Sequence, residues 1–530
     1  MQRKIRLLSP KSSLFLMALI FLGMVVYIRF RLLGLPLERD EGEYAYMAQQ
    51  LLQGVLPYTE STSLKFPGIF FVYAGILGIF GHTTFAIHFS LLLVNLATAF
   101  LLFLLGKNLI GWYGGIAAGV GFSVLTLSPT LQGLWANSEH FVLFPAVGGI
   151  LLLRVAQEKP IKIFFSGFFL GFALMIKQHA LFFCLFGILC LGSRVAVYSF
   201  KKTISFIGLF VAGGLAPISG LVVWYAITGN FSNFWFCTIQ YASEYVSLVS
   251  LDKGFENFKY NLAPILESNF TILWFTLFGL VSTSWRKIAN QEFSFLLGFF
   301  ICSFLAATPG LYFRPHYFIL WMPSLSLLMG LGLECLVSRF PSGRFNTIIP
   351  VGFLTLVLAL PVWIQREFYF VLSINEATRV VYGLNPFTES LEAAKYIRDH
   401  SGKDDKVAVL GSEPQIYFYS QRRSATRHLY IFPLMEKHAY SRKMQKEMIW
   451  EIEVAVPKFV VVVKLLEEWA SPDSAPQLLD WEENFLKSDY EIAGVIDIVS
   501  HYDVIYKWEE QARGYSPKSR FYLLIYKRRA

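Results

Sequence analysis

The chain has 530 residues, of which 55% are hydrophobic and 16% are charged, and its formal net charge is +9. Soluble proteins contain about 25% charged residues, so this chain has too little charge to cover a soluble fold of its size. Its basic residues are spread through short segments between apolar runs. This pattern is typical of membrane proteins and excludes nucleic acid as a partner. The composition predicts a polytopic α-helical membrane protein.

Long apolar runs recur along the first two thirds of the chain. A helix that crosses the bilayer needs about 20 mostly apolar residues. The runs that meet this requirement are 14–33, 85–106, 113–133, 139–156, 161–177, 180–198, 204–228, 268–284, 291–308, 316–337 and 345–365. They predict about eleven spans. A shorter apolar run, 66–80, starts beside a proline, and whether it crosses decides the topology of all later segments.

Basic residues indicate the orientation. If residues 66–80 lie at the outer interface, or dip in and return, the inner segments hold Arg3, Lys4, Arg6, Lys11, Lys107, Arg154, Lys159, Lys162, Arg194, Lys201, Lys202, Arg286, Lys287, Arg339 and Arg344. The outer segments then hold only Arg39, Lys65, Lys253, Lys259 and Arg314, with Lys177 at a span edge. Inner loops carry the excess of Lys and Arg. We therefore predict a cytoplasmic N-terminus and an extracytoplasmic C-terminal domain, and the layout favours a bacterial inner (plasma) membrane.

The composition changes near residue 366, where charged residues become frequent. The runs 406–410, 459–465 and 520–527 have strand character, and 388–400 has apolar residues at helical spacing. Strands that alternate with helices predict an α/β fold. We expect a membrane domain over 1–365 and a soluble extracytoplasmic α/β domain over 366–530.

The first external loop, predicted over 34–84, begins with a dense acidic segment that contains Glu38, Asp40, Glu41 and Glu43. A solvated acidic loop is the simpler interpretation. The alternative is a carboxylate at the membrane surface that acts as a general base, its pKa raised by neighbouring charges. The segment offers oxygen ligands for a divalent metal, but its spacing does not require one.

Other polar groups fall on the same outer side in this topology. They are Lys65, Glu139, Lys177, Arg314 and His316. Taken singly, a charged residue at the end of a span is often an interfacial anchor. Taken together, these cationic groups suit a phosphate or pyrophosphate headgroup.

Three short motifs resemble the GT-C glycosyltransferases, in the branch of the protein O-mannosyltransferases and the bacterial aminoarabinose transferase that modifies lipid A. They are Asp-Glu-x-x-Tyr-Ala at 40–45, Lys-x-Pro at 65–67 and His-Tyr-Phe-x-x-x-x-Pro at 316–323. The stretch 411–418 is similar to the outer domain of bacterial members. The resemblance follows the order of elements along nearly the whole chain. It departs at Phe66, where the family has the first proline of Lys-Pro-Pro.

The resemblance implies an inverting transfer from a polyprenyl-phosphate-linked sugar to a lipid, protein or polysaccharide acceptor on the outer face of the membrane. No cofactor is required, although some members use a divalent metal. The implied catalytic residues are Asp40 as the base, Glu41 beside it and Glu139. The implied contacts to the lipid phosphate are Lys65, Arg314 and His316, and the other substrate contacts are Tyr44, Lys177 and Tyr317.

Two other functions remain open from the sequence. A transporter also has many spans and a few buried charges, although no inverted repeat is evident. A polymerase or ligase that joins lipid-linked glycans would share the donor and differ in the acceptor. In the C-terminal domain, Tyr417 and Arg422 are candidates for acceptor binding or, more simply, for a packing role.

Overall fold

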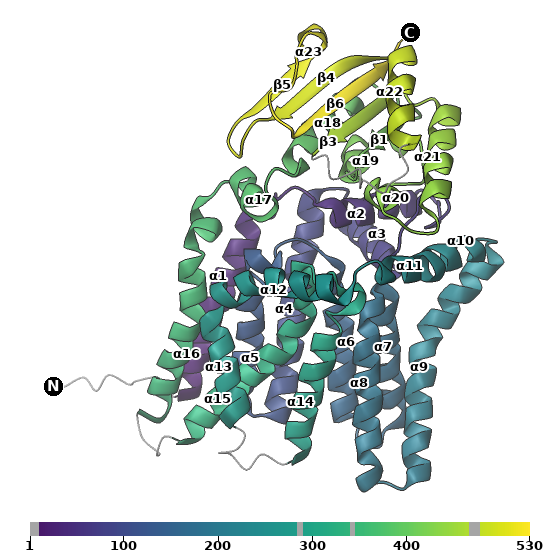
Figure 1. Ribbon diagram of the computed structural model, residues 1–530. Coiled ribbons are helices and arrows are strands. Elements are labelled where there is room, and N and C mark those ends of the chain that lie inside the picture. The colour runs from purple at the N-terminus through teal and green to yellow at the C-terminus, as the bar shows by residue number, and fades with distance from the viewer. Residues whose placement is uncertain (1–9, 283–289, 340–344, 466–476, 530) are drawn as a thin grey trace, which may run out of the picture. The chain divides into compact units, whose positions relative to one another are not determined.

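The computed structural model describes residues 10–282, 290–339, 345–465 and 477–529. Six of the basic residues used to predict the orientation lie outside these ranges: Arg3, Lys4, Arg6, Arg286, Lys287 and Arg344. The chain packs as two compact units (Figure 1). The first unit comprises 1–33, 88–224 and 249–371, and the second comprises 34–87, 225–248 and 372–530. The prediction placed the first external loop in the membrane domain, but its residues pack in the same unit as the C-terminal residues.

The first unit is built from apolar helices. They are α1 (Pro10–Arg31), most of α4 (Thr84–Leu109), α5 (Trp112–Leu125), α6 (Ser138–Val155), α7 (Pro160–Ile176), α8 (Leu181–Gly192), most of α9 (Phe200–Ile227), α12 (Leu251–Ser268), α13 (Phe270–Ser282), α14 (Asn290–Leu305), α15 (Met322–Arg339) and α16 (Phe345–Ile364). Close packing depends on small residues, as is usual between membrane helices. A Cβ on Gly330 of α15 would lie 2.2 Å from the carbonyl oxygen of Gly114 in α5.

Each of the eleven predicted runs contains an apolar helix, but the number of spans is not confirmed. Among the described residues, six helices are long and apolar enough to cross a membrane, or seven if the bent pair α12–α13 forms one span. The run 113–133 shows why an apolar run can be longer than the helix that it contains. Helix α5 ends at Leu125, and Pro129 then starts a separate 3₁₀ turn, because the residue before a proline disfavours helix. The count of eleven therefore stays a prediction.

The second unit contains a six-stranded sheet with the order β2-β1-β3-β6-β4-β5, and Figure 1 labels all of its strands except β2. The strands are β1 (Lys406–Leu410), β2 (Arg423–Ser424), β3 (Phe459–Lys464), β4 (Tyr490–Ile498), β5 (Val504–Trp508) and β6 (Tyr522–Arg528). β1 pairs in parallel with β2 and β3, and the other pairings are antiparallel. The three predicted strands correspond to β1, β3 and β6. This sheet confirms the prediction that the C-terminal part of the chain forms a domain that contains strands.

Helices cover both faces of this sheet. The unit's helices are α2 (Arg39–Leu52), α3 (Gly68–Phe80), α10 (Phe231–Trp235), α11 (Ala242–Ser247), α17 (Ile374–Tyr382), α18 (Phe387–Asp399), α19 (Gln415–Ser420), α20 (Phe432–Met435), α21 (Ser441–Ala455), α22 (Gln477–Asp489) and α23 (Glu510–Arg513). On one face, α21 and α22 pack with Val460 and Val462 in a common core. On the other, Tyr396 of α18 contacts the Phe459 ring. Since β3 is covered on both sides, its valine run is apolar at every position.

Candidate functional site

The acidic segment is the start of a helix and not the loop that the sequence analysis predicted. Helix α2 begins at Arg39, and Glu38 is its N-cap residue. The Glu38 side chain accepts a hydrogen bond from the backbone N–H of Glu41 at 3.0 Å, and the Glu41 side chain accepts one from the backbone N–H of Glu38 at 3.1 Å. This reciprocal pair is a capping box. Two of the four carboxylates therefore stabilise the helix end.

The other two carboxylates converge on Lys65. Its Nζ lies 2.7 Å from Oδ1 of Asp40 and 3.0 Å from Oε2 of Glu43, and 4.7 Å from the centre of the Tyr44 ring. Asp40, Glu43 and Tyr44 share one face of α2, because residues three and four apart on a helix are neighbours. The Asp40 side chain is 19% exposed, whereas that of Glu43 is 2% exposed. We call these four residues the Asp40 cluster.

Burial and neighbouring charges shift the pKa values of Glu38, Glu43 and Lys65. Burial, together with the charges of Asp40 and Glu41, raises the pKa of Glu38 well above its ordinary value. Burial also raises the pKa of Glu43, although the Lys65 ammonium opposes it. For Lys65, burial works to lower the pKa, but Asp40 and Glu43 outweigh it and hold that pKa well above its ordinary value. Lys65 is therefore a cation at neutral pH.

Helix α2 is fixed in place by residues from the C-terminal part of the same unit. Arg39 pairs with the buried carboxylate of Glu413 at 2.9 Å. A Cβ on Gly42 would lie 2.6 Å from the backbone nitrogen of Gln415, so only glycine allows α2 to approach α19 this closely. The position of Asp40 thus depends on residues more than 370 positions away in the chain.

A second set of predicted residues meets in the first unit. Glu139 lies in the first turn of α6, and Lys177 follows the end of α7. The two side chains form a buried ion pair. Lys177 Nζ also lies 4.2 Å from the centre of the Tyr317 ring. We call these three residues the Glu139 cluster.

Two histidines accompany the Glu139 cluster. The rings of His179 and His316 each lie 5.0 Å from the ring of Tyr317, centre to centre. His316 Nδ1 is 2.8 Å from Oε1 of Gln132, a residue with a positive φ of 54°. Such backbone strain is concentrated at functional sites. Arg314 is exposed, and its guanidinium lies 5.7 Å from the ring centre of a neighbouring tyrosine.

The structure therefore groups most predicted site residues by unit. One group is Asp40, Tyr44 and Lys65, and the other is Glu139, Lys177, His316 and Tyr317. Their chemical roles stay predictions. The sequence analysis assigned no site role to Glu43, Gln132 or His179, nor to Tyr430, whose hydroxyl donates to Oε2 of Glu43 at 3.3 Å. Glu43 was the easiest of them to predict from the sequence, because its spacing to Asp40 puts both residues on one helix face once the segment is recognised as a helix.

The carboxylates of the acidic segment already have partners within the protein. Among the described residues, no three His, Cys, Asp or Glu side chains are placed to hold one ion. Glu38 and Glu41 cap the helix, while Asp40 and Glu43 bind Lys65.

The two C-terminal candidates have packing roles. Tyr417 accepts a hydrogen bond from the backbone N–H of Val409 at 2.9 Å, which ties α19 to β1. Arg422 donates to the carbonyl oxygens of Arg398 and Ser401 at 3.0 and 2.7 Å, which satisfies carbonyls at the end of α18. These contacts leave neither side chain as the evident place for an acceptor.

Comparison with known proteins identifies the fold. No protein-family model and no curated protein matches the chain in sequence. Among solved structures, the oligosaccharyltransferase AglB of Archaeoglobus fulgidus, in complex with an inhibitory peptide and a dolichol-phosphate, is 11% identical. The match covers 94% of this chain and 74% of AglB, with a TM-score of 0.56. ArnT of Cupriavidus metallidurans bound to undecaprenyl phosphate is 12% identical, over 96% of this chain and 97% of ArnT, with a TM-score of 0.55.

Both proteins belong to the GT-C glycosyltransferases. At this level of identity the likeness shows the fold alone, and it confirms the fold that the three motifs predict. Apolar helices and membrane-protein neighbours together indicate a multi-pass membrane protein.

Proposed function

We propose that this chain is a membrane glycosyltransferase that transfers a sugar from a polyprenyl-phosphate-linked donor to an acceptor on the outer face of the membrane. The observation that carries the proposal is the ion pair between Asp40, in the first turn of α2, and Lys65, which lies just before α3, in a chain whose fold is shared with AglB and ArnT. The acceptor is a hydroxyl or amide of a lipid, protein or polysaccharide.

In the proposed reaction, the acceptor heteroatom attacks the anomeric carbon from the side opposite the phosphate, so the configuration inverts. The bond from that carbon to the phosphate oxygen breaks, and its electron pair leaves with the polyprenyl phosphate. Asp40 takes the proton from the acceptor as the new bond forms. It suits this role better than Glu43, because its side chain is partly exposed and that of Glu43 is not.

Lys65 provides the complementary charge. Its raised pKa keeps it an ammonium group, and an ammonium placed at the leaving phosphate stabilises the charge that develops there. Glu41 is assigned to capping of α2. Glu139 remains the proposed second acidic residue, and the remaining proposed substrate contacts are Tyr44, Lys177, Arg314, His316 and Tyr317. The reaction as proposed needs no cofactor.

The test uses full-length protein in nanodiscs with radiolabelled polyprenyl-phosphate sugars, and it measures release of polyprenyl phosphate. We expect turnover of one donor, persisting in EDTA, and a loss of about 10²–10⁴-fold in Asp40→Asn. The matched control is Asp480→Asn, which changes an exposed aspartate in the first turn of α22. Turnover that survives Asp40→Asn would remove Asp40 as the base. Failure with every donor, combined with uptake of a labelled solute into proteoliposomes, would favour a transporter.

A further inference from the structure

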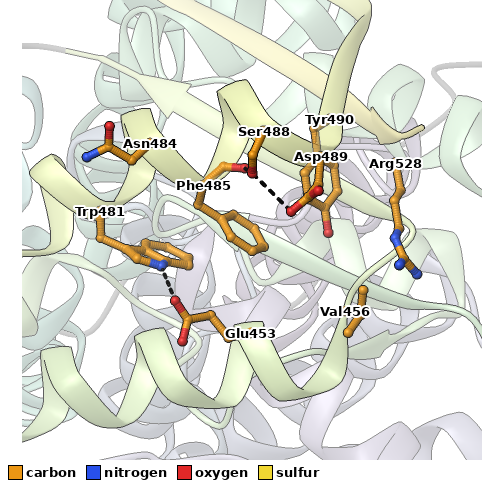
Figure 2. Close-up of a pocket in the computed structure, with 9 residues that line it drawn as sticks. All are labelled: Glu453, Val456, Trp481, Asn484, Phe485, Ser488, Asp489, Tyr490 and Arg528. Carbon is orange, nitrogen blue, oxygen red and sulfur yellow. Dashed lines mark hydrogen bonds between the residues drawn. The ribbon is translucent and has the colours of Figure 1, made fainter.

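The C-terminal sheet domain contains a cavity of about 540 Å³ beside α21 and α22. Glu453, Trp481, Asn484, Phe485, Asp489 and Arg528 are among the residues that line it (Figure 2). Its volume lies in the range of about 300–1,000 Å³ that is typical of small-molecule sites. No member of the Asp40 cluster or the Glu139 cluster lines it, so the cavity has no part in the chemistry proposed above.

One wall of the cavity is an aromatic surface. Trp481 and Phe485 lie one turn apart on α22, and their rings stack at 4.7 Å with an interplanar angle of 21°. The Phe485 ring is 5.2 Å from that of Tyr490. Trp481 Nε1 donates to Oε1 of Glu453 at 2.8 Å, which holds the indole against α21 (Figure 2). The rings are therefore held in position before any ligand arrives.

Polar groups surround this aromatic surface. Glu453, Asn484, Asp489 and Arg528 are exposed residues of the lining. Together they supply carboxylate acceptors, an amide that both donates and accepts, and a guanidinium that donates in a fixed fork. An apolar flat face edged by donors and acceptors matches a sugar ring, whose C–H face stacks on aromatic rings while its hydroxyls form hydrogen bonds.

Backbone strain lies at the same place. Val456 ends α21 with φ 45° and ψ 63°, and its side chain lines the cavity. A β-branched residue with positive φ is a genuine outlier, and such strain tends to be kept at ligand sites. This observation is independent of the side chains on α22.

The charge of the lining argues against an anionic ligand. The two carboxylates Glu453 and Asp489 outnumber the single cation Arg528 among the lining residues. A nucleotide could stack on Trp481, but its phosphates would meet these carboxylates. An apolar protein segment would have to desolvate the same charged groups.

We propose that this cavity binds a saccharide. Resting on the proposed function, we further propose that the saccharide is part of the acceptor, so that the domain holds a glycan chain while its end is extended. Saccharide binding in the cavity and turnover of the lipid-linked donor can be measured separately.

The binding test uses full-length protein in nanodiscs, since sugar-headed detergents would compete. Chitotetraose, cellotetraose and maltotetraose are titrated by calorimetry. We expect at least one to bind, and its affinity to fall about 10-fold or more in Trp481→Ala. The matched control is Trp450→Ala, which removes an exposed tryptophan of α21 that does not line the cavity. Trp481→Phe keeps an aromatic face and is expected to retain more affinity than Trp481→Ala.

Two results would overturn the saccharide site: no tetrasaccharide binds, or binding is equally strong in Trp481→Ala. The outcomes also separate the two proposals. Binding without turnover of any lipid-linked donor keeps the saccharide site and removes the transferase. Turnover of a donor without saccharide binding keeps the transferase and removes this site.

Discussion

The contact between α2 and α19 gives a direct test of how the fold positions Asp40. In Gly42→Ala the new Cβ would lie 2.6 Å from the backbone nitrogen of Gln415 and 2.9 Å from its Cα. Ordinary contacts between nonbonded carbons are about 3.5–4.0 Å, so the two helices must separate by about 1 Å. Because the obstacle is backbone, no side-chain rotation relieves it.

The cost follows from two opposing effects. Overpacking of a tight contact costs about 1–3 kcal/mol, and a backbone clash belongs at the upper end. Alanine in place of a helical glycine recovers about 0.5–1 kcal/mol. The net loss is about 2 kcal/mol, which lowers the midpoint of thermal unfolding by about 4–8 °C for a unit of this size. A displacement of about 1 Å at Asp40 is also expected to reduce turnover about 10²-fold.

Gly75→Ala in α3 is the matched control. It is also a helical glycine of the second unit, but a Cβ there meets nothing within 4 Å. Its unfolding midpoint is expected to equal or exceed that of the parent protein, with unchanged turnover. Both variants are measured by thermal unfolding and by donor turnover. If Gly42→Ala unfolds no earlier than Gly75→Ala, the close approach of α2 to α19 does not hold the site.

Two further predictions concern buried charges of the second unit. Burial raises the pKa of Glu43 in the folded state, so its contribution to stability is fully present below the unfolded pKa of about 4.3 and is lost as pH rises through the folded pKa. Relative to the parent protein, Glu43→Gln should therefore gain stability as the pH rises above about 4.3. A difference in unfolding midpoint that is independent of pH would contradict this. Arg379→Met leaves the buried carboxylate of Glu389 without its ion-pair partner and should cost about 3–5 kcal/mol in unfolding experiments. Arg398→Met, at an exposed pair, should cost less than about 1 kcal/mol, and equal effects of the two changes would refute the argument.

Structural features that depend only on neighbouring residues were the easiest to predict from the sequence. Each predicted apolar run contains a helix, since hydropathy depends only on nearby residues, but the number of spans is not confirmed. Helix lengths were harder to predict, because a break such as the one at Pro129 interrupts an otherwise apolar run. Strand β3 was recognised from its short valine run and the proline and charged residues that bound it, whereas β2, β4 and β5 were missed.

The acidic segment was misassigned for a similar reason. Its charge density favours a loop, but Glu38 and Glu41 have the spacing of a capping box, a local sign of a helix start. The sequence analysis did not predict which carboxylates pair with Lys65 and Lys177. Each depends on how separate helices pack, and no local pattern encodes that.

The two clusters contain the same three components. In each, a lysine ammonium binds a carboxylate and lies against a tyrosine ring: Lys65 with Asp40 and Tyr44, and Lys177 with Glu139 and Tyr317. Burying a lone ammonium or a lone carboxylate is costly, and pairing offsets that cost. The tyrosine faces add a cation–π attraction.

For the proposed reaction, this pairing in the Asp40 cluster links proton transfer to charge stabilisation. Before the reaction, Asp40 holds Lys65 at 2.7 Å, and the ammonium is largely neutralised by its partner. When Asp40 takes the proton of the acceptor, it loses its negative charge and its attraction for Lys65 weakens. That change coincides with the growth of negative charge on the leaving phosphate. Lys65 thus becomes available to stabilise the phosphate as negative charge develops there. The same two side chains therefore bind the substrate and the transition state differently.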